Sequence, residues 1–127
     1  MEKKLMHNQA YLLNLLDYNS WANDEFFKVI IKLPIDEIKK QHQSFMNSIR
    51  NSLNHLLVID KVWLANMKKE KHSFNNLQTI LFEDMEELWL AKKNEEEIIK
   101  KYTINLSSTE LEETVECDLI GGNSVNI

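Results

Sequence analysis

Two side chains in the stretch 48–67 could do chemistry, the imidazole of His55 and the carboxylate of Asp60. The apolar residues around them recur at the spacing of a helix face turned towards a core, and Asp60 occupies a step where this pattern predicts leucine. The face consists of Ile49, Leu53, Leu56, Trp63 and Met67. His55 lies on another side of the same helix. The pattern therefore places a carboxylate on a buried seam and an imidazole near its edge.

A single histidine on a helix flank is more often a surface or hydrogen-bonded residue than a ligand. His55 has no histidine or carboxylate four residues away, and His7, His42 and His72 fall near predicted helix ends and loops. These positions do not form the closely spaced pair that is typical of a zinc or nickel site. Cys117 stands among acidic neighbours, which raise rather than lower the pKa of a thiol. The residues alone thus do not specify a reaction.

Helical periodicity predicts three long helices, near residues 7–32, 44–69 and 76–102. Pro34 ends the first helix, because proline disfavours helical geometry in the residue before it. Only a short turn then separates the first two helices, so we expect them to pack against each other in antiparallel fashion.

The first helix carries two amides, Asn19 and Asn23, in the middle of an otherwise apolar seam. An unpaired buried amide costs about 1–3 kcal/mol, so both need partners. Antiparallel pairing of the first two helices brings Asn19 opposite Asp60. We therefore predict that Asp60 is substantially buried and accepts a hydrogen bond from Asn19; the alternative is that Asp60 faces a water-filled gap.

The pattern changes after residue 103. Apolar and polar residues alternate over 111–119, which is the period of a half-buried strand, and Gly121-Gly122-Asn123 has the composition of a hairpin turn. We expect a short β-hairpin-like segment within 111–127. The fold class predicted from these patterns is all-α, an up-down bundle of three long helices followed by this hairpin.

Composition narrows the class of protein. The chain of 127 residues is long enough for one domain, 1–127, and its net charge of −5 argues against a nucleic-acid partner. No leader sequence or run long enough to cross a bilayer is present, which predicts no membrane association. Cys117 is the only cysteine, so no internal disulfide forms and a reducing, cytoplasmic location is expected.

Two motifs resemble the DinB-like (damage-inducible protein) family. One is the run Tyr-Asn-Ser-Trp-Ala-Asn at 18–23, followed by Leu-Pro at 33–34. The other spans 48–64, with Ser-Ile at its start, His55-Leu-Leu in the middle, then Asp60 and Trp-Leu at its end. The resemblance implies a four-helix bundle, commonly dimeric, that holds a divalent metal (Zn, Ni or Mn) with three histidines.

His55 matches one of the three family ligands. The other two form a His-x-x-x-His pair on a last helix that follows the hairpin, and the sequence ends at Ile127, before that helix. We therefore expect a C-terminally shortened domain that lacks two of the three ligands. One imidazole supplies a single bond where a stable site needs three or more protein ligands, so tight metal binding is not expected.

Two hypotheses about function follow. The resemblance implies a metal-dependent protein of the thiol-transferase or hydrolase type, in which a metal would activate water or a small-molecule thiol. The alternative is a non-catalytic helical module that acts as a homo-oligomer, because three helices of a four-helix fold leave apolar surface for a second copy to cover. Trp21 and Trp89 are the candidate contacts of such a homodimer.

Overall fold

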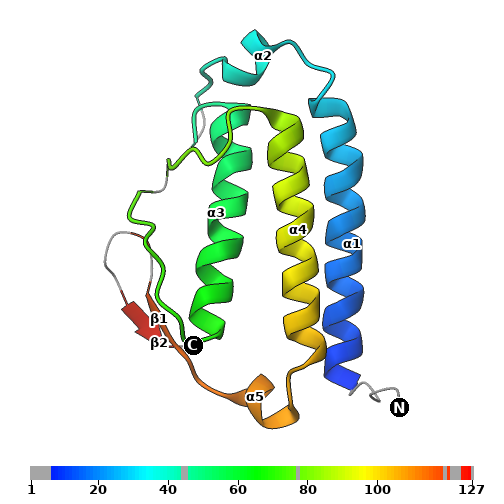
Figure 1. Ribbon diagram of the computed structural model, residues 1–127, viewed down its shortest axis with the longest axis vertical. Coiled ribbons are helices and arrows are strands. Elements are labelled where there is room, and N and C mark those ends of the chain that lie inside the picture. Colours follow the sequence, from blue (N-terminus) through cyan, green and yellow to red (C-terminus); the bar gives the residue numbers. More distant parts are fainter. Residues whose placement is uncertain (1–6, 44–45, 77, 119, 121–123, 127) are drawn as a thin grey trace.

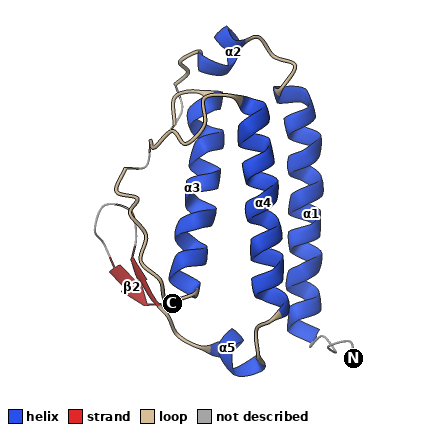
Figure 2. Ribbon diagram, viewed as in Figure 1, coloured by secondary structure: helices blue, strands red, loops and turns tan. Residues whose placement is uncertain are grey.

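The structure is a computed structural model that describes residues 7–43, 46–76, 78–118, 120 and 124–126. Three long helices dominate it, α1 (His7–Ile30), α3 (Ile49–Met67) and α4 (Met85–Ile104). Two short helices, α2 (Ile35–Lys39) and α5 (Ser108–Glu112), and two short strands, β1 (Glu116–Asp118) and β2 (Ser124–Asn126), complete the fold. The predicted all-α bundle with a small hairpin is confirmed (Figure 2).

The three long helices form one layer in which α4 lies between α3 and α1 (Figure 1). Helix α1 runs antiparallel to the other two. Helices α3 and α4 run in the same direction, because residues 68–84 return along the outer side of α3 before α4 begins. The expectation that the first two long helices pack directly against each other is therefore wrong, since α4 separates them.

The hydrophobic core lies at the end of the layer that carries α2. Ile38 of α2 is buried there and belongs to the same cluster as Phe27, Leu57 and Leu88 of the long helices. Trp89 packs on this cluster as well, stacking on Phe27 with ring centroids 6.1 Å apart. The segment 35–41, expected as a turn, thus contains one helical turn whose apolar side chain closes the core.

The buried faces are rotated from those that the sequence predicted. Leu53 of the predicted α3 seam is buried, but Leu56, Trp63 and Met67 are exposed on one side of the layer. The side chains that face inwards instead include Leu57, Val58, Val62 and Leu64. The predicted seam describes the side of α3 that a further element would cover, because a three-helix layer buries only part of each helix.

Helix α4 begins at Met85 and not near residue 76. Asn76 does act as a cap, but of a turn: its side chain accepts from Gln78 N, and Thr79 N bonds to Asn76 O. The helix itself starts behind Asp84, whose carboxylate accepts from Glu87 N at 3.0 Å.

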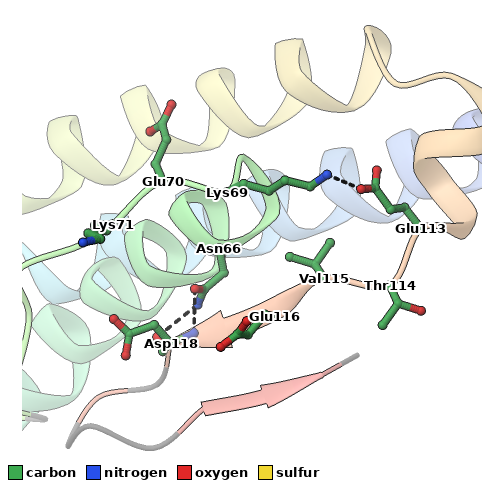
Figure 3. A pocket seen from close by; sticks show the side chains of 9 residues that line it. All are labelled: Asn66, Lys69, Glu70, Lys71, Glu113, Thr114, Val115, Glu116 and Asp118. Carbon is green, nitrogen blue, oxygen red and sulfur yellow. Dashed lines mark hydrogen bonds and ion pairs between the residues drawn. The ribbon is translucent and has the colours of Figure 1, made fainter.

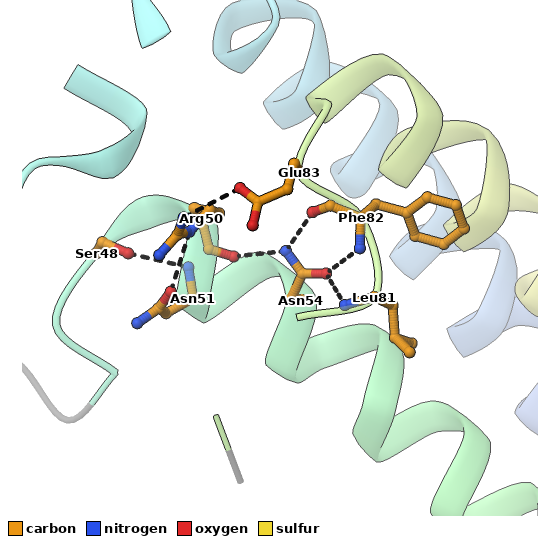
Figure 4. A network of polar contacts seen from close by, with 7 residues as sticks. All are labelled: Ser48, Arg50, Asn51, Asn54, Leu81, Phe82 and Glu83. Carbon is orange, nitrogen blue, oxygen red and sulfur yellow. Dashed lines mark hydrogen bonds and ion pairs between the residues drawn. The ribbon is translucent and has the colours of Figure 1, made fainter. Parts of the chain in front are cut away.

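Asn54 holds this preceding loop against α3 (Figure 4). Its side-chain oxygen accepts from the backbone N–H groups of Leu81 and Phe82, both at 2.9 Å. Its amide nitrogen donates to Phe82 O and Arg50 O, also at 2.9 Å. The side chain is fully buried, so these four bonds satisfy it completely. They fix residues 81 and 82 in a non-helical path.

The chain between α4 and the hairpin forms the short helix α5, where the sequence pattern indicated a strand from residue 111. Ser107 and Glu110 make a reciprocal capping box that starts this helix. The alternation of buried and exposed residues begins only at Val115 and Cys117, which are buried. β1 then pairs with β2 in antiparallel fashion, Cys117 opposite Val125. The hairpin turn residues 121–123 lie outside the described residues.

Candidate functional site

An apolar groove of about 560 Å³ opens on the side of the layer where α1 and α3 flank α4. Its walls are the exposed seam of α3 and the facing side of α1, and its floor is α4. The apolar lining includes Leu12, Leu16, Trp63, Met67, Ile99 and Leu106. Asn19 and Asp60 lie at its polar end, one on each wall. Volume and lining are those of a small-molecule pocket, mostly apolar with a few polar groups.

A polar network crosses the middle of the helical layer next to this groove. Lys92 of α4 pairs with Asp60 of α3, and its Nζ lies 3.8 Å from Glu96 Oε1. Glu96 also accepts a hydrogen bond from Asn23 Nδ2 of α1 at 2.8 Å. Lys61 of α3 pairs with Glu95 of α4 at 2.9 Å. The network thus joins all three long helices.

The network carries one more negative than positive charge. Lys92, Glu95 and Glu96 are 4%, 4% and 5% exposed, so these charges have little access to water. Asp60 is the carboxylate of the network that reaches the groove, with a quarter of its side chain exposed. Desolvation by burial raises the pKa of Asp60 above its ordinary value, although Lys92 acts in the opposite direction.

The predicted hydrogen bond between Asn19 and Asp60 is wrong. Asn19 is exposed at the groove, and Lys92 from the intervening helix is the partner of Asp60. Asp60 was expected to be substantially buried; it is half-buried, with a quarter of its side chain exposed, and it does pair across helices. Asn23 finds a buried partner, Glu96. The signal that the sequence offered for the true partner is the spacing of Lys92 and Glu96, one helical turn apart on α4.

His55 occupies a different face of α3 from Asp60. Helix geometry places it on the same side as Val62 and Asn66, which is turned away from α4. Asn66 shows what covers that side: its amide pairs with the backbone of Asp118 in β1, accepting from N at 2.8 Å and donating to O at 3.2 Å. His55, itself half-buried, therefore belongs to the face next to the loop and the hairpin and not to the groove.

The described residues do not converge into a metal site. Within ranges 7–43, 46–76 and 78–118, no group of three His, Cys, Asp or Glu side chains is placed to hold an ion. His72 serves the hairpin: its Nδ1 accepts from Phe74 N, so its Nε2 carries the proton and donates to Asp118 O at 2.6 Å. His42 is exposed in the connection between α2 and α3, and the side chain of His7 lies outside the described residues.

A second cavity, of about 620 Å³, lies between the end of α3 and β1 (Figure 3). Its lining is mostly charged and exposed, and the ion pair between Lys69 and Glu113 closes one side. Exposed ion pairs contribute little to stability or recognition because water screens them. The cavity brings together neither His55 nor the buried network, so the groove is the stronger candidate.

Comparison with known proteins identifies the family. Searches of curated proteins and of solved structures find no match. No described helix is both long and apolar enough to cross a bilayer. The model of the DinB family matches residues 5–118, which is most of the chain. The chain therefore belongs to the DinB family, as its two motifs predicted.

Proposed function

We propose that this protein is a helical binding module that works as a homodimer, with α1 as the contact between its two copies. The observation that supports this proposal is a second apolar stripe on α1, on the side that faces away from α4. Tyr11, Leu15, Tyr18, Phe26 and Val29 form the outer stripe, and each is between 49% and 66% exposed. The stripe adjoins the groove at Leu15, which also lines the groove. Trp21, also exposed, packs its ring against Tyr18 at 5.8 Å.

The spacing of the outer stripe suits helix pairing. Its members follow one another at steps of four, three, eight and three residues, and Ala22 divides the eight-residue step into two four-residue steps, as in the seam of a coiled coil. A surface helix of a monomer needs only one apolar stripe, which packs on the core. A helix that is apolar on two opposite sides is typically covered by other parts of the protein on both sides. A two-fold axis lets the same stripe of two copies cover each other.

The total accessible surface supports the same proposal. The chain exposes 8658 Å², whereas a folded monomer of 15.0 kDa exposes roughly 7,000 Å². The excess is of the size that one subunit contributes to a stable homodimer interface. A convex helix surface without charge along its centre is better suited to self-pairing than the groove, because a second copy there would take the carboxylate of Asp60 further out of water.

Replacing Tyr18 by lysine should convert the dimer to a monomer at micromolar concentration. The substitution puts a charge from each copy at the centre of the outer stripe, where neither has a partner, and weakens association by at least tenfold. Sedimentation equilibrium of the wild type and of Tyr18→Lys measures this.

Leu90→Lys is the matched control, because Leu90 is as exposed as Tyr18 but lies on α4. It should leave the dimer intact. A wild-type chain that sediments as a stable monomer, or equal loss of association in both variants, would rule the proposal out.

The second candidate function is metal-dependent chemistry of the thiol-transferase or hydrolase type. DinB family proteins are generally metal-binding, and the resemblance of the motif at 48–64 implies that His55 is one of the family's ligands. The described residues of this chain do not fit a metal on their own, because His55 has no second and third ligand placed beside it. The observation that favours this candidate is thus family membership together with one residue.

Calorimetric titration of the chain with zinc at neutral pH separates the two candidates. We expect no saturable site of sub-micromolar affinity, since one imidazole forms a single bond to the metal. One-to-one tight binding that His55→Gln abolishes and His42→Gln retains would favour the metal-dependent function instead. His42 is a suitable control because it is exposed and lies outside α3, in the connection between α2 and α3.

A further inference from the structure

We propose that the two copies of the dimer pair their α1 helices in antiparallel fashion, with Tyr18 of each copy packed on the partner's Ala22. This inference rests on the proposed function, because it concerns how the outer stripe of one copy meets the same stripe of the other. The sizes of the side chains in the stripe and the charge at its edge select this arrangement over a parallel one.

Contacts with α4 fix which side of α1 faces outwards. Asn23 donates to Glu96 Oε1 at 2.8 Å, and the carboxylate of Asp17 lies 3.2 Å from Lys100 Nζ. Phe27 of the same helix packs in the core and is 1% exposed. Helix geometry then places the outer stripe on the side away from these contacts. A second copy therefore meets α1 as a ridge of fixed orientation, in which the order of large and small side chains matters.

The outer stripe has one small residue between bulky ones. Ala22 occupies the step between Tyr18 and Phe26, so the ridge is low at this point. In a parallel pair each position faces its own counterpart, which would place Tyr18 against Tyr18 and Ala22 against Ala22. The first of these layers would be crowded and the second would leave a void, and both lower the stability of the pair.

An antiparallel pair whose two-fold axis passes between Tyr18 and Ala22 removes this mismatch. Tyr18 then lies against the partner's Ala22, and symmetry repeats the contact on the other side of the axis. Tyr11 lies seven residues before Tyr18, and Val29 lies seven residues after Ala22. The same register therefore brings Tyr11 opposite the partner's Val29, and these two side chains are 63% and 61% exposed in the single chain.

The charge at the edge of the stripe favours the same orientation. Glu25 follows Ala22 by three residues, and its ion pair with Lys28 is exposed, so Lys28 compensates its charge only weakly. A parallel pair would bring the two Glu25 carboxylates to the same level of the seam, where like charges repel. In the antiparallel pair Glu25 lies level with the partner's Leu15. The two carboxylates are then ten residues apart along the helices, or about 15 Å, and salt screens charges at that separation.

The antiparallel arrangement also covers Trp21, which is 59% exposed and lies next to Ala22 on the edge of the stripe that carries Glu25. A two-fold axis at right angles to the helices keeps these edges on one side of the pair. The two Trp21 rings therefore lie close to the axis and near each other, each beside the Tyr18 ring that it contacts in its own copy.

Replacing Ala22 by leucine gives opposite results for the two orientations. In the antiparallel pair the added side chain meets the partner's Tyr18 in a layer that is already filled, and association should weaken about tenfold in sedimentation equilibrium. In a parallel pair the same side chain would fill a void, and association would tighten. Unchanged or tighter association of Ala22→Leu would overturn the inference.

Cross-linking through introduced cysteines tests the register. Tyr11→Cys and Val29→Cys are treated with a short bis-maleimide, each alone and in an equimolar mixture after exchange of subunits. We expect a linked dimer in the mixture only, because thiols of the same variant lie about 27 Å apart along an antiparallel pair. A mixture of Leu90→Cys with Val29→Cys is the control and should give no link, since Leu90 is as exposed as Tyr11 but lies on α4. The native Cys117 is fully buried, and the wild type reports any reaction there.

Sedimentation of the wild type separates failure of this inference from failure of the proposed function. A dimer whose single variants link to themselves pairs its helices in parallel, which overturns the inference and keeps the homodimer. A dimer that gives no link in the mixture of Tyr11→Cys and Val29→Cys meets in another register or through another surface, and this result also overturns the inference. A wild-type chain that stays monomeric rules out both.

Discussion

Replacing Lys92 by methionine is expected to lower the free energy of unfolding by about 3–5 kcal/mol at neutral pH. Lys92 is almost completely buried and is the cation between Asp60 and Glu96. Its removal leaves three carboxylates near one another with Lys61 as the remaining cation of the network. Chemical denaturation followed by circular dichroism measures the change. Lys101→Met, at an exposed position on the same helix, is the control and should change stability by less than about 0.5 kcal/mol.

Acid should reduce the effect of Lys92→Met. Burial already raises the pKa of Asp60 above 3.8 in the wild type, and losing Lys92 raises it further. A carboxyl group with a raised pKa in the folded state binds its proton more tightly when folded, so it favours folding increasingly as pH falls through that pKa. The stability difference between variant and wild type should therefore shrink from neutral pH towards the pKa of Asp60. A difference that is absent at neutral pH, or that grows on acidification, would contradict the described network.

Adding Asp60→Leu to Lys92→Met should recover part of the lost stability, because it removes one uncompensated carboxylate and adds apolar contact to the groove. Asn19→Leu should change stability by less than about 0.5 kcal/mol, since Asn19 is exposed and is not the partner of Asp60.

Replacing Asn54 by leucine is expected to cost about 3–5 kcal/mol, a large share of the stability of a domain of this size. The change leaves the N–H groups of Leu81 and Phe82 and the carbonyl groups of Phe82 and Arg50 without the side chain that satisfies them. Each buried polar group without a partner costs about 1–3 kcal/mol, and local rearrangement recovers part of the sum.

Hydrogen exchange gives this prediction a second readout. In Asn54→Leu the amides of Leu81 and Phe82 should lose protection before the amides in the middle of α3 do. Asn94→Leu is the control, because Asn94 is an exposed amide on α4. Unchanged protection at residues 81 and 82 would show that Asn54 does not hold the loop.

The sequence predicted the long elements well, because helical periodicity is a local property. The predicted start of α4 was wrong because Asn54 prevents a helix over 76–84. This side chain lies almost thirty residues away in the chain. The strand predicted from residue 111 does not form there, for a local reason. Ser107 and Glu110 form a capping box that starts helix α5, and the sequence shows this motif.

The sequence identified residues of the site more accurately than it identified the contacts between them. Asp60 was singled out by interrupting an apolar stripe, and it is indeed the groove's charged residue. Its partner was missed because the order of helices in the layer depends on the long return of residues 68–84, which no local pattern records. His55 was selected by family resemblance, and among the described residues no group of three His, Cys, Asp or Glu side chains is placed to hold a metal.

The separation of the two surfaces can be tested in one sample by fluorine NMR of the chain labelled with 5-fluorotryptophan. Trp21 lies beside the outer stripe, Trp63 lines the groove, and Trp89 packs on Phe27 in the core. Dilution through the dimer dissociation range should shift the Trp21 resonance alone, because the outer stripe is where the two copies meet. A shift of Trp63 on dilution would place the second copy in the groove, and no shift at any concentration would show that the outer stripe stays uncovered.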